Sequence, residues 1–356
     1  MSTNQLELVE NNQFKSKQRI EYIDLMKGFC IILVVYYHCV FSFFVEGIDL
    51  ALKNFRMPLY FFLSGLFFKK YNGFTDFVVR KSNKLVLPYL FFSIIPFCLL
   101  APLFSTHYMS HVINSDYHSF MFWVNSLLST YNMPLWFLRS LFMTYILYYG
   151  FKTLTEKRSQ LFQIITLIVI TILVWLITLY LQDPQFLAIQ DNIRLFITST
   201  LVVPFMVLPF MYVAEWVRKT NLLNKQLTVK QEIILLIISI AFMIGFAQPN
   251  VLFINAQFGR IYPFMFISAF SGITALALIC KRINRLPYFS YLGRYSLIVL
   301  GTHWPFILVL RAMQVRVSLQ LLIIFAIMPI TIWIFKTLFP YFTAQKDLIK
   351  FSKHQK

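Results

Sequence analysis

Ten apolar blocks, many of them close to the length that crosses a lipid bilayer, constrain the fold of this chain more than any other feature. A transmembrane helix needs about 20 mainly apolar residues. Only 13% of the 356 residues are charged, whereas soluble domains carry about 25%. We therefore predict an all-α, polytopic bundle of about ten transmembrane helices. Their expected ranges are 28–46, 57–68, 86–104, 135–150, 161–181, 195–214, 231–247, 261–280, 295–310 and 319–339.

The remaining segments suggest a single membrane domain with two tails. Residues 1–18 are polar and lack the apolar core of a signal peptide, so we expect a flexible cytoplasmic N-terminal tail. Residues 19–340 would form the membrane domain, and 341–356 a basic cytoplasmic C-terminal tail. Segment 118–130 is apolar but too short to cross, which predicts an interfacial or re-entrant segment.

The distribution of positive charge predicts the orientation of the chain. With the N-terminus in the cytoplasm, 25 of the 32 Lys and Arg residues fall on the cytoplasmic side and 7 on the outer side. This asymmetry follows the positive-inside rule and predicts that both termini are cytoplasmic. The net charge of +18 therefore indicates a lipid bilayer as partner and no nucleic acid, since the basic residues form no single patch.

The cysteines and the loop histidines give no metal-binding pattern. All four cysteines lie in apolar blocks without CxxC spacing, which is typical of small buried apolar residues. His107, His111 and His118 share an outer loop but lack cysteine or carboxylate ligands at metal spacing. We expect solvated loop residues and no bound metal.

Polar residues of the first predicted helix fall on one face. Lys27 and His38 are eleven residues apart, which leaves an angular offset of about 20° and an axial separation of about 16 Å. Asp24 and Ser42 lie within about 60° of the same face. This stripe runs from the cytoplasmic surface to the middle of the membrane. Between its ends it is lined by Ile31, Val34 and Val35.

Two interpretations of this stripe are open. Lys27 can extend to the lipid headgroups, and His38 can hydrogen-bond a neighbouring helix. Alternatively, an ionisable residue at the depth of His38 marks a functional site, where a neutral imidazole can accept a proton.

A second histidine lies at a similar depth in the ninth predicted helix. Ser296 precedes His303 by seven residues, so the two side chains share a face with an offset of about 20°. Two histidines in the middle of the membrane predict a shared polar cavity.

Three further groups of residues have both a structural and a functional interpretation. Arg80, Lys81 and Lys84 either follow the positive-inside rule or bind the phosphates of a cytoplasmic donor. Ser64 lies in a short span that contains Pro58 and Gly65. Both residue types weaken a membrane helix, and they are tolerated where either a neighbouring helix or a cavity satisfies the backbone. Arg139, near Trp136, either extends to the outer headgroups or contacts an acceptor.

Five stretches in order resemble the acyltransferase-3 family of integral membrane acyltransferases, over residues 19 to 340. The most specific motif is Arg or Lys, ten intervening residues and His, which Lys27 and His38 match. The Arg-x-x-Arg pair of the family is represented by Lys81 and Lys84, which keep the charge but lose bidentate phosphate recognition. The five stretches are 19–38, 56–68, 80–89, 135–142 and 292–305.

The resemblance implies a ten-helix bundle in the plasma membrane that transfers an acyl group, usually acetyl from acetyl-CoA. The acceptor would be a hydroxyl of a cell-envelope glycan or a lipid-linked saccharide. His38 would be the catalytic residue, acting as a base or as an acyl carrier. The cations at the acyl-CoA would be Lys27, Arg80, Lys81 and Lys84. Supporting residues would be Asp24, Ser42, Ser64, Trp136, Arg139, Ser296 and His303.

A transporter is the alternative class of protein. Intramembrane histidines can relay protons or line the path of a solute. The sequence shows no inverted repeat, however, and few acidic residues within the spans.

Overall fold

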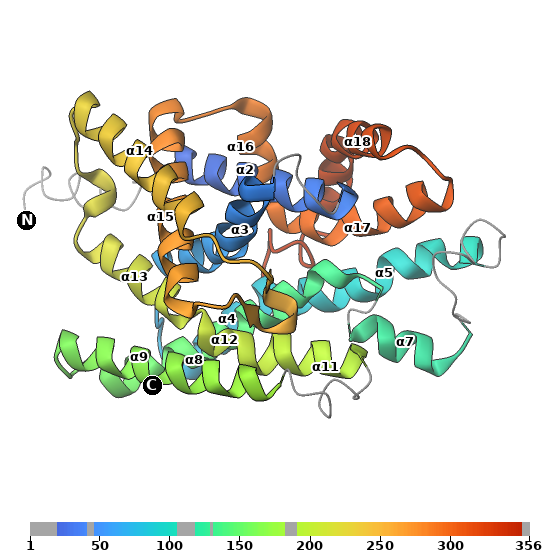
Figure 1. Ribbon diagram of the computed structural model, residues 1–356. Helices are drawn as coiled ribbons and strands as arrows, with labels where there is room; N and C mark the ends of the chain where they lie inside the picture. The colour runs from blue at the N-terminus through green and yellow to red at the C-terminus, as the bar shows by residue number, and fades with distance from the viewer. Residues whose placement is uncertain (1–19, 41–45, 105–117, 129–130, 182–190, 351–356) are drawn as a thin grey trace, which may run out of the picture.

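The structure, a computed structural model, describes residues 20–40, 46–104, 118–128, 131–181 and 191–350, which form an almost entirely helical bundle (Figure 1). The predicted all-α class is confirmed. The first helices are α2 (Glu21–Val40), α3 (Glu46–Leu66), α4 (Phe74–Lys81), α5 (Leu87–Phe104), α7 (Phe120–Leu127), α8 (Trp136–Thr155) and α9 (Gln160–Tyr180). The later helices are α11 (Asp191–Ile197), α12 (Val203–Met206), α13 (Leu208–Lys219), α14 (Val229–Gly245), α15 (Tyr262–Ile283), α16 (Pro287–Arg294), α17 (Ser296–Ala312) and α18 (Val317–Leu338).

Short elements connect these helices. Two of them, η1 and η3, are π-helical turns that continue into the next helix. An antiparallel hairpin pairs Val251 with Phe258. The short elements are η1 (Ser82–Val86), η2 (Met133–Leu135), η3 (Thr198–Val202), η4 (Leu222–Asn224), β1 (Val251–Leu252), η5 (Phe253–Asn255) and β2 (Gln257–Phe258).

Six helical stretches of the described chain are long and apolar enough to cross a membrane, and the pair α16 and α17, bent by 89°, would make a seventh. Each of the ten predicted ranges overlaps a helix, but α3, α8 and α14 do not meet the same criteria. The number of ten crossings therefore stays a prediction. The second predicted range, 57–68, starts too late, because α3 begins at Glu46. Several charged residues lie between Glu46 and residue 57 and lower the hydropathy of this part of the helix.

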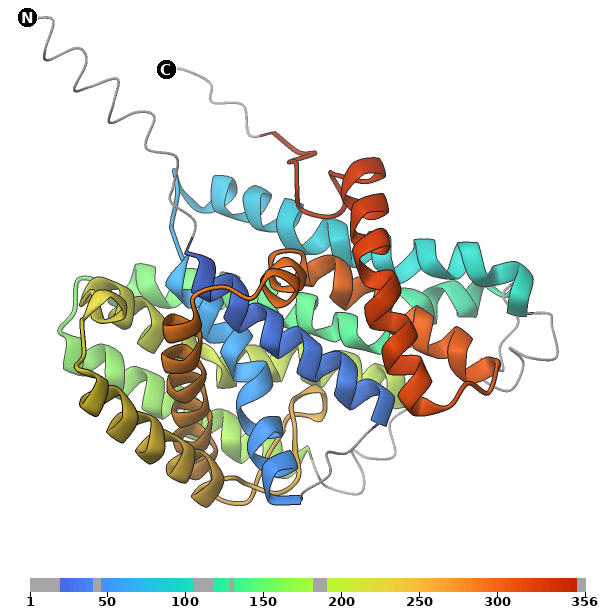
Figure 2. The same cartoon turned by 90° about the horizontal axis from the view of Figure 1, so that it is seen from above.

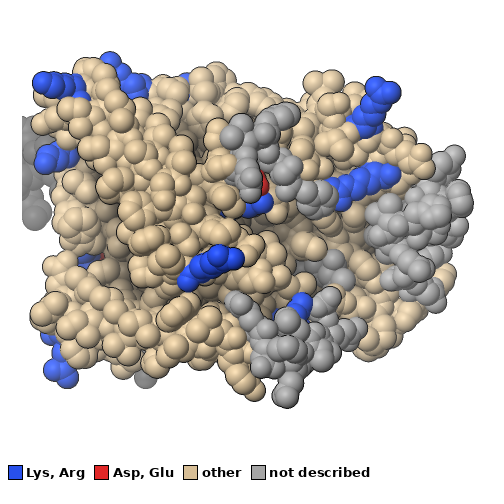
Figure 3. Space-filling model, viewed as in Figure 1, with Lys and Arg blue, Asp and Glu red and all other residues tan. Residues whose placement is uncertain are grey.

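The surface of the bundle is largely apolar. Along α9, exposed leucine and isoleucine side chains follow one another turn after turn, including Leu161, Ile165, Ile168, Ile172 and Leu176. Figure 3 shows a broad uncharged surface with few Lys and Arg side chains. An exposed apolar surface this wide is not stable in water. The chain is therefore a multi-pass membrane protein.

The helix that carries Lys27 and His38 crosses the bundle in close contact with α15, α16, α17 and α18 (Figure 2). Its crossing with α16 brings two backbones together. A Cβ atom on Gly28 would meet the carbonyl group of Phe289, and a Cβ atom on Gly293 would meet the carbonyl group of Asp24. Only glycine allows this approach, which fixes α2 against α16.

We expect Gly28→Leu to destabilise the protein by at least about 1–3 kcal/mol, because the larger side chain must push α16 away. Thermal unfolding of the detergent-solubilised protein would measure the loss. Gly150→Leu on α8 is the matched control, since a Cβ atom there meets nothing within 4 Å. Equal melting temperatures for the two variants would contradict this account of the crossing.

Candidate functional site

The two intramembrane histidines lie in direct contact. His38 on α2 and His303 on α17 are 265 residues apart in the sequence, and Nδ1 of His38 lies 2.9 Å from Nε2 of His303. The two rings are parallel to within 5°. His303 is fully buried, whereas His38 is only half-buried. The structure thus joins the two histidines that the sequence placed at similar depth.

The backbone determines which nitrogen of each histidine carries a proton. Nδ1 of His303 lies 2.8 Å from the carbonyl oxygen of Val299, which can only accept, so Nδ1 donates. Nε2 of a neutral His303 then accepts a hydrogen bond from Nδ1 of His38. A neutral His38 therefore carries its lone pair on Nε2, the atom that can take a proton from a ligand.

His38 lines a cavity beside α2. This His38 cavity has a volume of about 410 Å³. Residues 251–255 of the hairpin segment form part of its wall. The ring of Trp304 meets the ring of His38 edge-on, with centroids 5.4 Å apart. The polar and aromatic walls are formed by Tyr37, Lys53, Arg56, Trp136 and Trp304.

Another cavity, closer to the N-terminal end of α2, has a volume of about 160 Å³. We call it the Lys27 cavity. The hydroxyl of Tyr60 donates to the backbone carbonyl of Lys27 over 3.2 Å, and the Lys27 ammonium lies 5.7 Å from the ring centre of Phe67. Its polar lining is formed by Lys27, Tyr60, Ser64, Lys84 and Ser296.

The two cavities share three apolar lining residues. Val34, Met57 and Leu300 belong to the walls of both, so the cavities abut, and we call these three residues the junction. A long, thin ligand could keep an anionic end near the lysines and extend its other end through the junction toward His38.

Asp24, Arg139 and His303 line neither cavity, so of the two histidines only His38 reaches a cavity wall. The Asp24 carboxylate is buried against α16, 3.7 Å from Nε of Arg294. Arg139 donates to the carbonyl oxygen of Leu128 over 2.8 Å and to the hydroxyl of Ser199 over 3.2 Å. It therefore fastens α8 to neighbouring elements. Ser42 lies outside the described residues, as do His107 and His111.

The four cations predicted at a donor are divided by the structure. Arg80 pairs with Asp76 at 2.7 Å, and the Lys81 ammonium lies 3.5 Å from the ring centre of Tyr145. Neither lines the Lys27 cavity. Lys27 and Lys84 are the two that the structure brings to one cavity.

The last described residues of the chain contact Lys84, which remains exposed. Its ammonium lies 2.9 Å from the carboxylate of Asp347 and donates to the carbonyl oxygen of Ala344 over 2.8 Å. The neighbouring Asn83 amide accepts from the backbone of Leu348 and Ile349. Lys84 belongs to the π-helical turn η1, a backbone form that is frequent at functional sites.

A family model described as an acyltransferase domain matches residues 20–339, nearly the whole chain. The chain belongs to the acyltransferase-3 family. This match confirms the resemblance seen in the sequence motifs. No curated protein and no solved structure shows a significant match.

In this acyltransferase, both residues of the most specific family motif line the two adjoining cavities. Lys27 lies at one cavity and His38 at the other, on opposite sides of the junction. Because they stand three turns apart on one helix, a single ligand can contact both.

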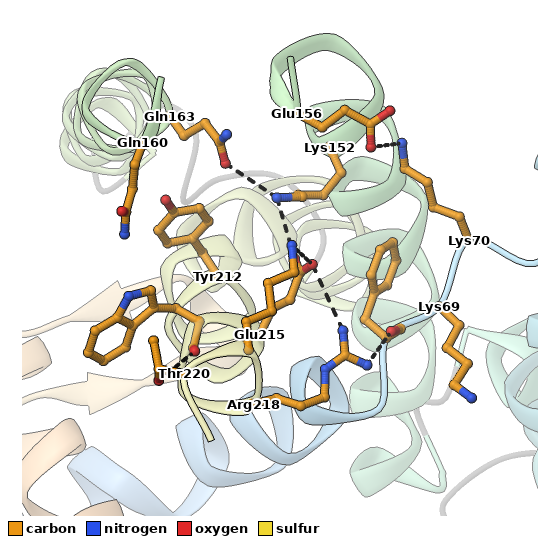
Figure 4. A pocket seen from close by; sticks show the side chains of 13 residues that line it. Lys69, Lys70, Lys152, Glu156, Gln160, Gln163, Tyr212, Glu215, Arg218 and Thr220 are labelled. Atoms are coloured by element: carbon orange, nitrogen blue, oxygen red, sulfur yellow. Dashed lines mark hydrogen bonds and ion pairs between the residues drawn. The ribbon is translucent and has the colours of Figure 1, made fainter. Parts of the chain in front are cut away.

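The acyltransferase has another pocket, of about 600 Å³, between the ends of α3, α8, α9 and α13 (Figure 4). The buried Glu215 carboxylate lies at its centre, 2.8 Å from Lys219 and 3.6 Å from Lys152. At the rim, Lys70 donates to Glu156 over 2.7 Å and holds the pKa of that carboxyl below its ordinary value. The carboxylates balance part of the positive charge, which indicates a structural network.

Two cations of the His38 cavity are not among the site residues predicted from the sequence. The sequence prediction includes Lys53 and Arg56 only among the seven charges of the outer side, because the predicted second helix begins after them, at residue 57. Within α3 they stand three residues apart and face the cavity that holds His38. The three-residue spacing of Lys53 and Arg56, which puts both on one side of a helix, could have revealed this face.

Proposed function

We propose that this acyltransferase moves a short acyl group, most simply acetyl, from a cytoplasmic acyl-CoA to a hydroxyl of a cell-envelope glycan or lipid-linked saccharide. It would work in the plasma membrane with both termini in the cytoplasm, as the charge asymmetry predicts. The adjoining cavities, with lysines at one and His38 at the other, are the observation that carries this proposal.

The donor occupies the Lys27 cavity in this proposal. Phosphates of coenzyme A are highly charged, and Lys27 and Lys84 supply the positive charges that bind them. The thin arm of the donor passes Val34, Met57 and Leu300, and the thioester enters the space beside His38. No metal is needed for the proposed step.

His38 acts as the general base. Its Nε2 takes the proton of the acceptor hydroxyl while that oxygen forms a bond to the thioester carbonyl carbon. The carbon–sulfur bond then breaks, and the thiolate of coenzyme A takes the proton from His38. His303 keeps Nδ1 of His38 bonded throughout, so that Nε2 faces the acceptor.

The proposal is tested by determining from which side of the membrane acetyl-CoA is used. Sealed inside-out membrane vesicles given acetyl-labelled acetyl-CoA should incorporate label into their glycans or lipid-linked saccharides. Right-side-out vesicles should not, because acetyl-CoA does not cross the membrane and the lysines face inward. Vesicles from cells lacking the gene give the background.

Equal incorporation by both kinds of vesicle would contradict the orientation. Label that accumulates inside the vesicles without covalent attachment would contradict the enzyme and favour a transporter.

A further inference from the structure

A buried arginine lines the cavity of His38 without a full set of partners. Arg56 is only 8% exposed, and its Nε atom has no hydrogen-bond partner. One terminal nitrogen reaches the carbonyl oxygen of Leu33 at 3.5 Å, which is a weak contact. Its guanidinium carbon lies 4.3 Å from the ring centre of Tyr37.

Arg56 forms no ion pair in the part of the chain that the structure describes, and the Asp49 carboxylate attracts it only from a longer distance. No described carboxylate lies within 4.0 Å of its guanidinium, because Asp49 pairs with Lys53 at 2.5 Å instead. Among the described residues, the walls of the His38 cavity contain two cations and no carboxylate. A charge at this depth is costly unless it is paired, and it usually marks a ligand site.

Arg56 lies in the same cavity wall as His38, the proposed catalytic base. Tyr37, against which the guanidinium packs, directly precedes His38 on α2, and both residues line the cavity. An anionic group held by Arg56 would therefore place a neighbouring part of the same molecule beside Nε2 of His38. The phosphates of the donor are expected at Lys27 and Lys84, on the other side of the junction.

We propose that the His38 cavity selects an acceptor that carries an anionic group, a phosphate or a carboxylate, and that Arg56 binds this group. The inference rests on the proposed acyl transfer and names the class of its acceptor. Arginine suits this role because its planar fork donates two parallel hydrogen bonds to either anion. The charge of Lys53, three residues away, is already balanced by Asp49, so Arg56 is the cation left for the ligand.

Two measurements test the proposal: the charge of the acylated product, and the kinetics of variants of Arg56. Membranes that contain the native acceptor are incubated with acetyl-labelled acetyl-CoA, and the labelled product is passed over an anion exchanger at neutral pH. We expect retention of the product. Loss of retention after phosphatase or mild acid identifies a phosphate, and loss after carbodiimide coupling to an amine identifies a carboxylate.

The variants connect this charge to Arg56. With acceptor supplied as a titrated membrane extract, Arg56→Gln should raise the apparent KM for acceptor at least about tenfold, and Arg56→Lys should raise it less. The KM for acetyl-CoA should not change in either variant. Arg316→Gln, which alters an exposed arginine, is the matched control, and size-exclusion profiles in detergent verify folding.

Three results would overturn the proposal. They are a neutral product, an Arg56→Gln variant that behaves like Arg316→Gln, and a fall in kcat at unchanged acceptor KM, which would assign Arg56 to the transition state only. Absence of labelled product with the wild-type protein would instead overturn the proposed transferase function, and this inference with it.

Discussion

Replacing His38 by glutamine should reduce acyl transfer by at least about 10²–10⁴-fold, the range expected for loss of a general base. Glutamine fills a similar volume and can hydrogen-bond His303, so the α2–α17 contact is retained. It cannot take a proton from the acceptor hydroxyl. Initial rates of label transfer from acetyl-CoA, normalised to the amount of inserted protein, measure the effect.

The control for this prediction is a second histidine of the chain. His118 is exposed and lies far from His38 in the sequence, so His118→Gln should transfer label at the wild-type rate. A His38→Gln variant with an equal rate would refute the catalytic assignment. If His38 instead carries the acyl group, wild-type protein denatured rapidly in cold detergent at neutral pH, where an acylimidazole survives longer than in acid, would hold label that His38→Gln lacks.

Helical periodicity is enough to predict the relation between Lys27 and His38. Eleven residues return a helix to almost the same face, and the structure places both side chains on cavity walls along α2. Asp24 shares that face only approximately. Its carboxylate turns instead toward Arg294, because the glycine contact brings α16 against this part of α2.

The sequence suggests an encounter between His38 and His303 but does not determine it. Their similar depths make a contact plausible, but 265 residues separate them. Whether α2 lies next to α17 depends on packing across the whole bundle. The alignment of the two rings also depends on the Val299 carbonyl, since this oxygen decides which nitrogen of His303 is the acceptor.

The second helix shows where hydropathy fails as a guide. Asp49, Lys53 and Arg56 lower the apolar character of the first half of α3, so the predicted span begins at residue 57. This is the half that faces the His38 cavity with Lys53 and Arg56. A membrane helix that lines a polar cavity need not be apolar on every face. The charged residues that face the cavity are therefore the ones that hide the start of α3 from a hydropathy count.

Replacing His303 by leucine should lower kcat by about 10²-fold, the scale of effect for a misplaced reacting group. Leucine cannot accept the hydrogen bond from Nδ1 of His38, so the imidazole loses the contact that directs its Nε2 toward the acceptor. The KM for acetyl-CoA should stay unchanged, because the cations proposed to bind the donor, Lys27 and Lys84, lie at the other cavity. Initial rates at saturating and limiting donor separate the two constants.

Glutamine at position 303 distinguishes a positioning role from a packing role. Its side-chain oxygen can accept from Nδ1 of His38, so His303→Gln should retain activity within about tenfold of the wild type. A purely structural role predicts the reverse order, since apolar leucine is better tolerated than glutamine at a fully buried membrane site. Equal losses of kcat in the leucine and glutamine variants would therefore contradict orientation of His38 by His303.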